Sequence, residues 1–223
     1  RSRRFLDSIV KKHEKAMNGV VGAYSGGKKA ESMTPIHPEY VADVLDQEAS
    51  EDAVFTVDTG MCNVWAARYI SPNGKRRVIG SFLHGSMANA MPHAIGVAAS
   101  QPGREVIAMA GDGGLAMLLG ELVTIKHYDL PVKIVLFDNA TLGMVRLEML
   151  VDGLPAFGTD SPVVDYAAVA RAVGIPAVRV EDPKDLRKAL RGALDRPGPA
   201  LIDVVTDPHA LSIPPTITAG QVR

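Results

Sequence analysis

Short apolar runs alternate with longer amphipathic segments along most of the chain. Such runs are typical of strands buried on both faces of a sheet, and the intervening segments carry apolar residues at helical spacing. Six runs qualify as strands: 53–57, 77–80, 105–108, 131–137, 177–180 and 200–205. Strands that alternate with helices predict an α/β fold, a doubly wound and mostly parallel six-stranded sheet with helices on both faces.

The first 33 residues follow a different pattern. Residues 4–18 predict an amphipathic helix, with Phe5 and Ile9 on its apolar side and lysines on the other. Residues 19–33 are rich in glycine and serine and predict a flexible linker. A basic amphipathic helix can lie on a membrane or pack against protein, and we expect the second. We therefore separate 1–33 from a globular domain at 34–223.

Composition narrows the class of protein. The 223 residues include 24 basic and 25 acidic side chains, a formal net charge of −1 that gives no electrostatic case for nucleic-acid binding. The single cysteine, Cys62, excludes an internal disulfide and is compatible with a reducing cytoplasm. No apolar run approaches the roughly 18 residues of a membrane helix. The start lacks the apolar core of a secretory signal. It also lacks an initiator Met, so we expect a fragment or a processed chain.

One strand–turn–helix–strand unit carries the strongest chemical signal. The turn Gly111–Gly114 follows a buried strand, a helix is predicted over 115–122, and the next strand ends at Asp138 and Asn139. Asn139 lies 27 residues after Asp112. Parallel neighbouring strands bring both side chains to the carboxyl edge of the sheet, where open α/β sheets bind ligands.

The residue types at this edge favour Mg²⁺ and a phosphate. Carboxylate, amide and backbone oxygens suit Mg²⁺, while glycines and free N–H groups at a helix start suit an anion. The alternative is that Gly-Asp-Gly only shapes the turn. We favour the metal–phosphate site because the Asp–Asn spacing occurs with strands on both sides.

The Gly-Asp-Gly turn followed by Asn at this spacing resembles the thiamine diphosphate (ThDP) motif. The surrounding sequence resembles the pyruvate oxidase and pyruvate:quinone oxidoreductase branch of that family. The resemblance is carried by Val64–Tyr69, Gly80–Pro92 and Asp203–Val205, and covers residues from about 35 to 215. It implies that 1–33 is left from a preceding domain and that 34–223 is the C-terminal, diphosphate-binding domain.

The resemblance also implies a set of site residues. Asp112, Asn139 and the backbone oxygen of Thr141 are the expected metal ligands, and Gly113 and Gly114 are expected to offer N–H groups to the diphosphate.

Further positions are expected around the organic part of the cofactor. Gly85, Ser86 and Met87 match the segment that holds the aminopyrimidine, with Met87 as the wedge under the thiazolium. The remaining expected cofactor-binding residues are Gly60, Ala140, Leu142, Gly143, Met144 and Val145. Met144 departs from the aromatic residue frequent in flavin-linked relatives, and Asp138 stands where relatives often have Asn.

Several nearby residues keep two interpretations. Asp58, at a strand end, either shapes the cofactor pocket or caps the helix that follows. His84 is either a substrate contact or a structural residue. Cys62 and Trp65, in contrast, are expected to be packing residues only.

The segment 151–162 predicts a loop that we expect to be mobile and to cover the pocket.

The resemblance implies oxidative decarboxylation of pyruvate to acetate or acetyl phosphate and CO₂, with electrons passing through FAD to quinone or oxygen. The activating Glu and most of the FAD site are expected on other domains, so no complete catalytic set is expected in this chain and the isolated chain should be inactive. The parent is expected to be a cytoplasmic homotetramer, peripheral on the inner face of the cell membrane if it uses quinone.

Two alternatives stay open. The chain can belong to another ThDP enzyme, such as an acetolactate synthase or a 2-oxo acid decarboxylase. It can also be a non-catalytic module that binds Mg²⁺ and phosphate.

Overall fold

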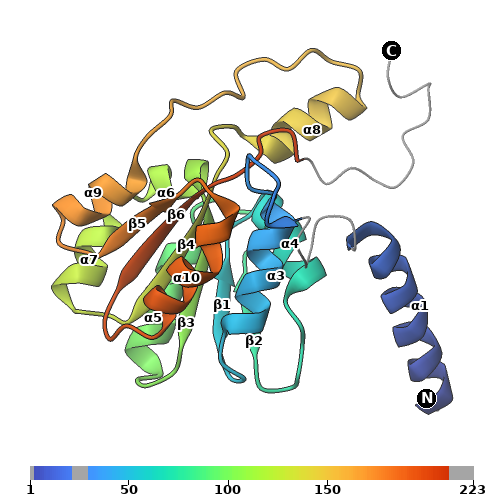
Figure 1. Cartoon of the computed structure of the whole chain (residues 1–223), viewed down its shortest axis with the longest axis horizontal. Helices are drawn as coiled ribbons and strands as arrows, with labels where there is room; N and C mark the ends of the chain where they lie inside the picture. Colours follow the sequence, from blue (N-terminus) through green and yellow to red (C-terminus); the bar gives the residue numbers. More distant parts are fainter. Residues whose placement is uncertain (1–2, 22–29, 211–223) are drawn as a thin grey trace.

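A six-stranded, all-parallel sheet forms the centre of the molecule (Figure 1). The computed structural model describes residues 3–21 and 30–210. The strand order is β2-β1-β3-β4-β6-β5. The strands are β1 (Val54–Val57), β2 (Arg77–Gly80), β3 (Val106–Gly111), β4 (Val132–Asp138), β5 (Ala177–Val180) and β6 (Ala200–Val205). The predicted fold class is confirmed.

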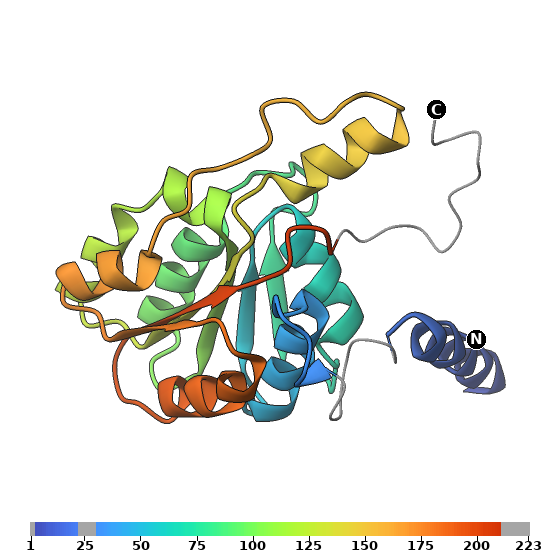
Figure 2. The same ribbon diagram turned by 45° about the horizontal axis from the view of Figure 1, so that its top comes forward.

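Helices cover both faces of this sheet, as Figure 2 shows. One face packs against α3 (Pro38–Glu48), α4 (Met61–Tyr69) and α10 (Pro183–Leu194). The other packs against α5 (Ala90–Ser100), α7 (Glu121–His127) and α9 (Tyr166–Ala172). The short helices α6 (Asp112–Met117) and α8 (Gly143–Val151) stand at the carboxyl ends of the strands.

Strand β4 shows why the apolar runs are continuous rather than alternating. All its residues are buried. Val135 and Phe137 join the core on the α3 side, while Ile134 and Leu136 join the core on the α5 side. Both side-chain directions therefore need apolar residues, as is usual for a parallel strand covered on two faces.

The helix predicted over 115–122 is wrong in its bounds. Helix α6 begins at Asp112 itself and ends at Met117, and α7 begins only at Glu121. The backbone leaves the helical region at Leu118, whose φ is −125° and whose N–H bonds to the oxygen of Leu115, three residues back. The consequence is that the glycines of the turn belong to the first turn of a helix.

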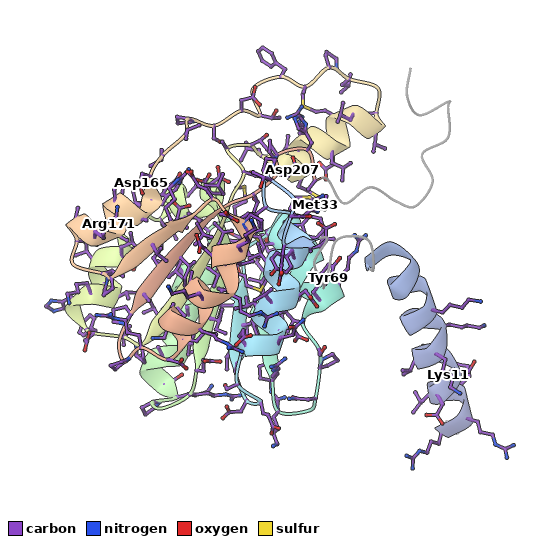
Figure 3. The ribbon with its side chains drawn as sticks, viewed as in Figure 1. Lys11, Met33, Tyr69, Asp165, Arg171 and Asp207 are labelled. Carbon is purple, nitrogen blue, oxygen red and sulfur yellow. The ribbon has the colours of Figure 1, made fainter. Side chains whose placement is uncertain are left out.

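The predicted N-terminal helix is present as α1 (Arg3–Val21), which takes no part in either helical layer (Figure 1). Its apolar residues Phe5, Leu6, Ile9 and Val10 are exposed. Lys11 projects from the same helix in Figure 3. Most of the linker predicted over 19–33 falls outside the described residues. Among the helices of the described ranges, none is long and apolar enough to cross a membrane.

Candidate functional site

A pocket lies at the carboxyl edge of β1, β3 and β4. Since β2 lies on one side of β1 and β3 on the other, the chain reverses direction across the sheet here, where doubly wound folds bind ligands. Most of the predicted residues line the pocket: Gly60, Met87, Asp112, Gly113, Gly114, Asn139, Thr141, Leu142, Gly143, Met144 and Val145. Tertiary structure therefore gathers residues from four separate segments of the chain.

Asp112 provides a buried carboxylate between two strand ends. It is 3% exposed, and the backbone N–H groups of Asp112 itself, Gly113 and Asn139 partly offset the effect of burial on its pKa. Burial, with the Asp138 carboxylate nearby as a smaller cause, raises its pKa to about 6. Asp112 has no ion-pair partner within the described ranges. A cation bound beside it would supply the missing positive charge.

The loop after β4 presents two more oxygen atoms. The Asn139 side-chain oxygen accepts the Thr141 N–H at 3.1 Å, and the Thr141 carbonyl accepts the Gly143 N–H at 2.9 Å. Each oxygen keeps a second lone pair. Ala140 between them has a φ of 51°, uncommon for a residue with a side chain, and the Thr141 hydroxyl donates to the Thr159 carbonyl at 3.0 Å. The loop is thus held in one conformation.

These donors fit a hard divalent cation. Carboxylate, amide and carbonyl oxygens are the ligands that Mg²⁺ takes, with water or phosphate oxygens completing the set. The described part of the chain holds no cluster of three or more His, Cys, Asp or Glu side chains suited to a metal. A metal at this edge would depend on the amide and backbone oxygens beside Asp112.

The two glycines of the turn are required by close packing. A Cβ on Gly114 would stand 2.1 Å from Oδ2 of Asp58 and 3.3 Å from the Ala88 nitrogen. A Cβ on Gly113 would stand 2.9 Å from Leu142 Cδ2 and 3.4 Å from Met87 Cε. Neither position could carry a side chain without a shift of Asp58, Leu142 or Met87, so both need glycine.

Asp58 lines the pocket rather than capping the following helix. The N-cap of α4 is Gly60, with a φ of 130° and no side-chain cap bond. Asp58 Oδ1 instead accepts the N–H of Ala90, the first residue of α5, at 2.9 Å, and Oδ2 has no protein partner in the described ranges. Burial raises the pKa of Asp58 to about 6. The capping alternative for α4 is wrong.

The apolar wall of the pocket is formed by Met87, Met144, Trp65 and Cys62. Trp65 is 2% exposed and belongs to the core on the α3 side, and burial raises the pKa of the Cys62 thiol. Both are packing residues, as predicted, although each also reaches the pocket. Met144 is part-buried against the same core.

Three predicted cofactor residues do not line the pocket. Ala140 lies in the loop after β4, and Gly85 and Ser86 lie in the exposed loop after β2. His84 is exposed in that same loop and likewise does not line the pocket.

The loop predicted over 151–162 is irregular beyond Gly153 and lies outside the pocket lining. It is tied to the loop after β4, because the Thr159 carbonyl accepts the Leu142 N–H at 2.8 Å and the Ser161 N–H bonds to Ala140. Phe157 is 84% exposed, so this part of the segment faces solvent.

Sequence reasoning missed several lining residues. Phe137 is the last residue but one of β4 and Thr206 directly follows β6, positions that could have identified them. Pro38 begins α3, and no local signal links it to the site. Pro38 lies at the pocket because Ile36, two residues earlier, forms a β-bridge with Thr206 and accepts the N–H of Asp207. Figure 3 labels Asp207.

Comparison with known proteins gives a family match over most of this structure. Residues 58–204 match the model described as thiamine pyrophosphate enzyme, C-terminal TPP binding domain; TPP is another name for ThDP. A Bacillus subtilis (strain 168) protein provisionally named as thiamine pyrophosphate-containing, YdaP, is 33% identical over 221 residues, covering 99% of this chain and 38% of YdaP.

Two further relatives are named as acetolactate synthases. Acetolactate synthase 2, chloroplastic, of Brassica napus is 36% identical over 196 residues, covering 83% of this chain and 30% of that protein. A probable acetolactate synthase large subunit of Methanococcus aeolicus is 35% identical over 189 residues, covering 81% and 32%. The chain thus spans 30–38% of the length of these three relatives.

Proposed function

Because the chain belongs to the thiamine pyrophosphate enzyme family, as the C-terminal TPP-binding domain, we propose that it holds the Mg²⁺ and diphosphate of ThDP in an enzyme that decarboxylates a short 2-oxo acid such as pyruvate. The observation that carries this proposal is the unpaired, buried carboxylate of Asp112 beside Asn139 and the bare glycines of α6. Negative charge without a cation, next to N–H groups at the start of a helix, would suit a metal diphosphate.

Each residue has a proposed role in binding or orientation. Asp112, Asn139 and the Thr141 carbonyl would hold Mg²⁺, while N–H groups of Gly113 and Gly114 would face the diphosphate. Bound ThDP would supply the electron sink for decarboxylation, so the protein contributes position and electrostatics.

The apolar wall has a separate role. Met87 lines the pocket, with its Cε 3.4 Å from where a Cβ on Gly113 would stand, and would support the bent cofactor. Trp65 and Met144 would keep water from the inner side of the pocket, which strengthens electrostatic interactions there.

The names of the relatives favour acetolactate synthesis as the complete reaction. In that reading the two-carbon unit left by decarboxylation joins a second 2-oxo acid. The support is that named acetolactate synthases from plants and an archaeon align over about four fifths of the chain.

A specific stretch favours a second candidate, flavin-linked oxidation of pyruvate. Val64–Tyr69 and Gly80–Pro92 resemble pyruvate oxidase and pyruvate:quinone oxidoreductase sequences. In that reading FAD, held mainly by other domains, passes electrons to quinone or oxygen, and the parent is a cytoplasmic homotetramer, peripheral at the membrane if quinone is the acceptor. Met144, in place of an aromatic residue, is the departure from this reading.

Product analysis separates the candidates. The full-length gene product that contains this chain would be supplied with ThDP, Mg²⁺, FAD and pyruvate. Acetolactate without flavin bleaching supports the synthase, whereas acetate or acetyl phosphate with reduced flavin supports the oxidoreductase. Tight ThDP binding without CO₂ release would favour a non-catalytic module, and no ThDP binding at high Mg²⁺ would overturn the proposal.

A further inference from the structure

A buried ion network lies directly behind the candidate metal site. Arg179, on the edge strand β5, reaches a carboxylate on the neighbouring strand β6 and another at the end of β4. Its Nη1 lies 2.6 Å from Asp203 Oδ2 and 3.0 Å from Asp138 Oδ2, and 3.2 Å from the Val164 carbonyl. The side chains of Asp203 and Asp138 are 0% and 4% exposed. One positive charge is therefore shared by two buried carboxylates, and the Arg179 Nε also bonds to the exposed Glu181 carboxylate at 3.1 Å.

Stability alone is a weak explanation for such a network. Burying charges removes them from water, and a buried ion pair often stabilises a fold no more than apolar residues of similar volume would. Within the described ranges, no other cation pairs with Asp138 or Asp203. Removing Arg179 would leave two buried carboxylates uncompensated.

Hydrogen bonds lead from this network to both strand ends of the metal site. Asp138 directly precedes Asn139, so its position sets where the loop after β4 begins. Asp203 Oδ2 also accepts the N–H of Ala167 at 3.4 Å, in the first turn of α9. The neighbouring Tyr166 hydroxyl donates to the Asp112 carbonyl at 3.3 Å. The same arginine is thus connected to the residues expected to hold the metal from two strands.

The exposed charges of α9 take no part in this connection. Asp165 caps the helix and pairs with Arg171 at 3.6 Å, and Figure 3 shows both residues at the outer side of α9. Both side chains are about half exposed, whereas the inward contacts of α9 go to Asp203 and Asp112. The contacts of α9 with the candidate metal site therefore come from Tyr166 and Ala167.

We propose that Arg179 is a positioning residue for the metal site, which holds Asp138 and Asp203 so that Asn139, Thr141 and Asp112 face one cation. This proposal rests on the proposed Mg²⁺ and diphosphate site. Arginine suits the role because its planar guanidinium can reach several acceptors at fixed angles, whereas lysine offers a point charge.

The test measures metal affinity in the full-length gene product that contains this chain, with Mn²⁺ as the probe and ThDP present. Free Mn²⁺ is followed by electron paramagnetic resonance, so no catalytic activity is needed. Arg179→Met is expected to weaken Mn²⁺ binding by about 10–100-fold, the usual range for outer-shell partners of a metal site. Arg179→Lys keeps the charge and is expected to restore part of the affinity.

Arg76→Met is the matched control. The side chain of Arg76 is 10% exposed and pairs with Asp46 at 2.6 Å, immediately before β2 at the opposite edge of the sheet. Its loss should lower the thermal midpoint without changing Mn²⁺ affinity. A fall in affinity equal to that of Arg179→Met would show that general destabilisation is the cause and would overturn the proposal.

The remaining outcomes distinguish a failure of the positioning role from a failure of the metal site. If the unsubstituted chain binds Mn²⁺ with ThDP and Arg179→Met binds equally well, Arg179 has no positioning role, although the metal site stands. If the unsubstituted chain does not bind, both proposals are wrong. Should Arg179→Met fail to fold by circular dichroism, Arg179→Lys decides alone: reduced affinity in a folded chain supports the proposal, and unchanged affinity overturns it.

Discussion

Buried charges are paired differently at the amino and the carboxyl ends of the strands. At the amino edge, the Arg76 guanidinium bonds to the Asp46 carboxylate and to the carbonyls of Asp46, Ala49 and Ser50. At the carboxyl edge, Asp58 and Asp112 are each 3% exposed and have no cation beside them in the described ranges. The buried guanidinium of Arg76 is thus paired with a carboxylate, whereas the buried carboxylates of Asp58 and Asp112 are not paired with a cation.

This difference indicates where a ligand belongs. Burying a carboxylate without a cation is unfavourable, and proteins usually pair it or place it against a metal. The raised pKa values of Asp58 and Asp112 have burial as their main cause. A site that is unfavourable when empty is one whose formation a bound cation can stabilise. If a cation binds beside these carboxylates, substitutions there should change metal affinity and the stability of the metal-free chain.

The largest expected effect is the loss of metal binding in Asp112→Ala. It removes the one charged side chain among the proposed ligands, so Mn²⁺ affinity in the presence of ThDP should fall by roughly 100-fold or more, beyond the usual effect of outer-shell changes. Asp112→Asn should lose affinity too, yet the metal-free chain should be no less stable, because a buried charge is removed. Calorimetry measures the metal affinity, and thermal denaturation measures the stability of the metal-free chain. Unchanged affinity in folded Asp112→Ala would contradict the metal assignment.

Gly114→Ala should disrupt the carboxyl edge directly. The new Cβ would lie 2.1 Å from Asp58 Oδ2, which is part of a buried side chain held by Ala90, so the strand end or α6 must shift. Overpacking of this kind costs about 1–3 kcal/mol. Urea denaturation of the metal-free chain measures the change in unfolding free energy.

Gly96→Ala is the control for that substitution. Gly96 lies within α5 and a Cβ there would meet nothing within 4 Å, so the same change should stabilise the helix by about 0.5–1 kcal/mol. Equal effects at the two positions would show that Gly114 is not under packing constraint.

Stability of the metal-free chain should depend on pH through Asp58. The pKa of Asp58 in the folded chain, about 6, lies above the ordinary 3.8, so the folded state favours the protonated carboxyl. With respect to this group, the free energy of unfolding is highest below about pH 4 and falls as the pH rises through 6. Asp58→Asn should therefore gain stability relative to the unsubstituted chain between pH 5 and 7.5, by up to about 3 kcal/mol. Parallel stability–pH curves for the two chains would contradict this account.

Met87→Ala is expected to have the smallest effect on the metal-free fold. Met87 is only part-buried, so truncation should destabilise the chain by about 1 kcal/mol, while Mn²⁺ affinity stays unchanged. Turnover of the full-length gene product should fall, since the support under the cofactor is removed. Met117→Ala, at a 62% exposed position, is the control and should change neither quantity. Unaffected turnover in Met87→Ala would reduce Met87 to a packing residue.

The order of strands and helices could be predicted closely, whereas the break in the helix after β3 could not. Residues 115–122 have helical periodicity throughout, but the backbone turns away at Leu118. Periodicity records which side of a segment is buried and carries little information about where the backbone leaves a helix. The role of Asp58 was likewise open, because its hydrogen-bond partner, Ala90, lies 32 residues away.

What the sequence determined by itself is the parallel sheet and the residue types at the ends of β3 and β4. Buried strands need apolar residues on both faces, and this requirement is visible in the linear pattern. Only the tertiary structure decided that Arg179 on β5 supports Asp138 at the end of β4, through contacts across β6. Such contacts depend on strand order, and strand order is set by the packing of the whole sheet rather than by any local segment.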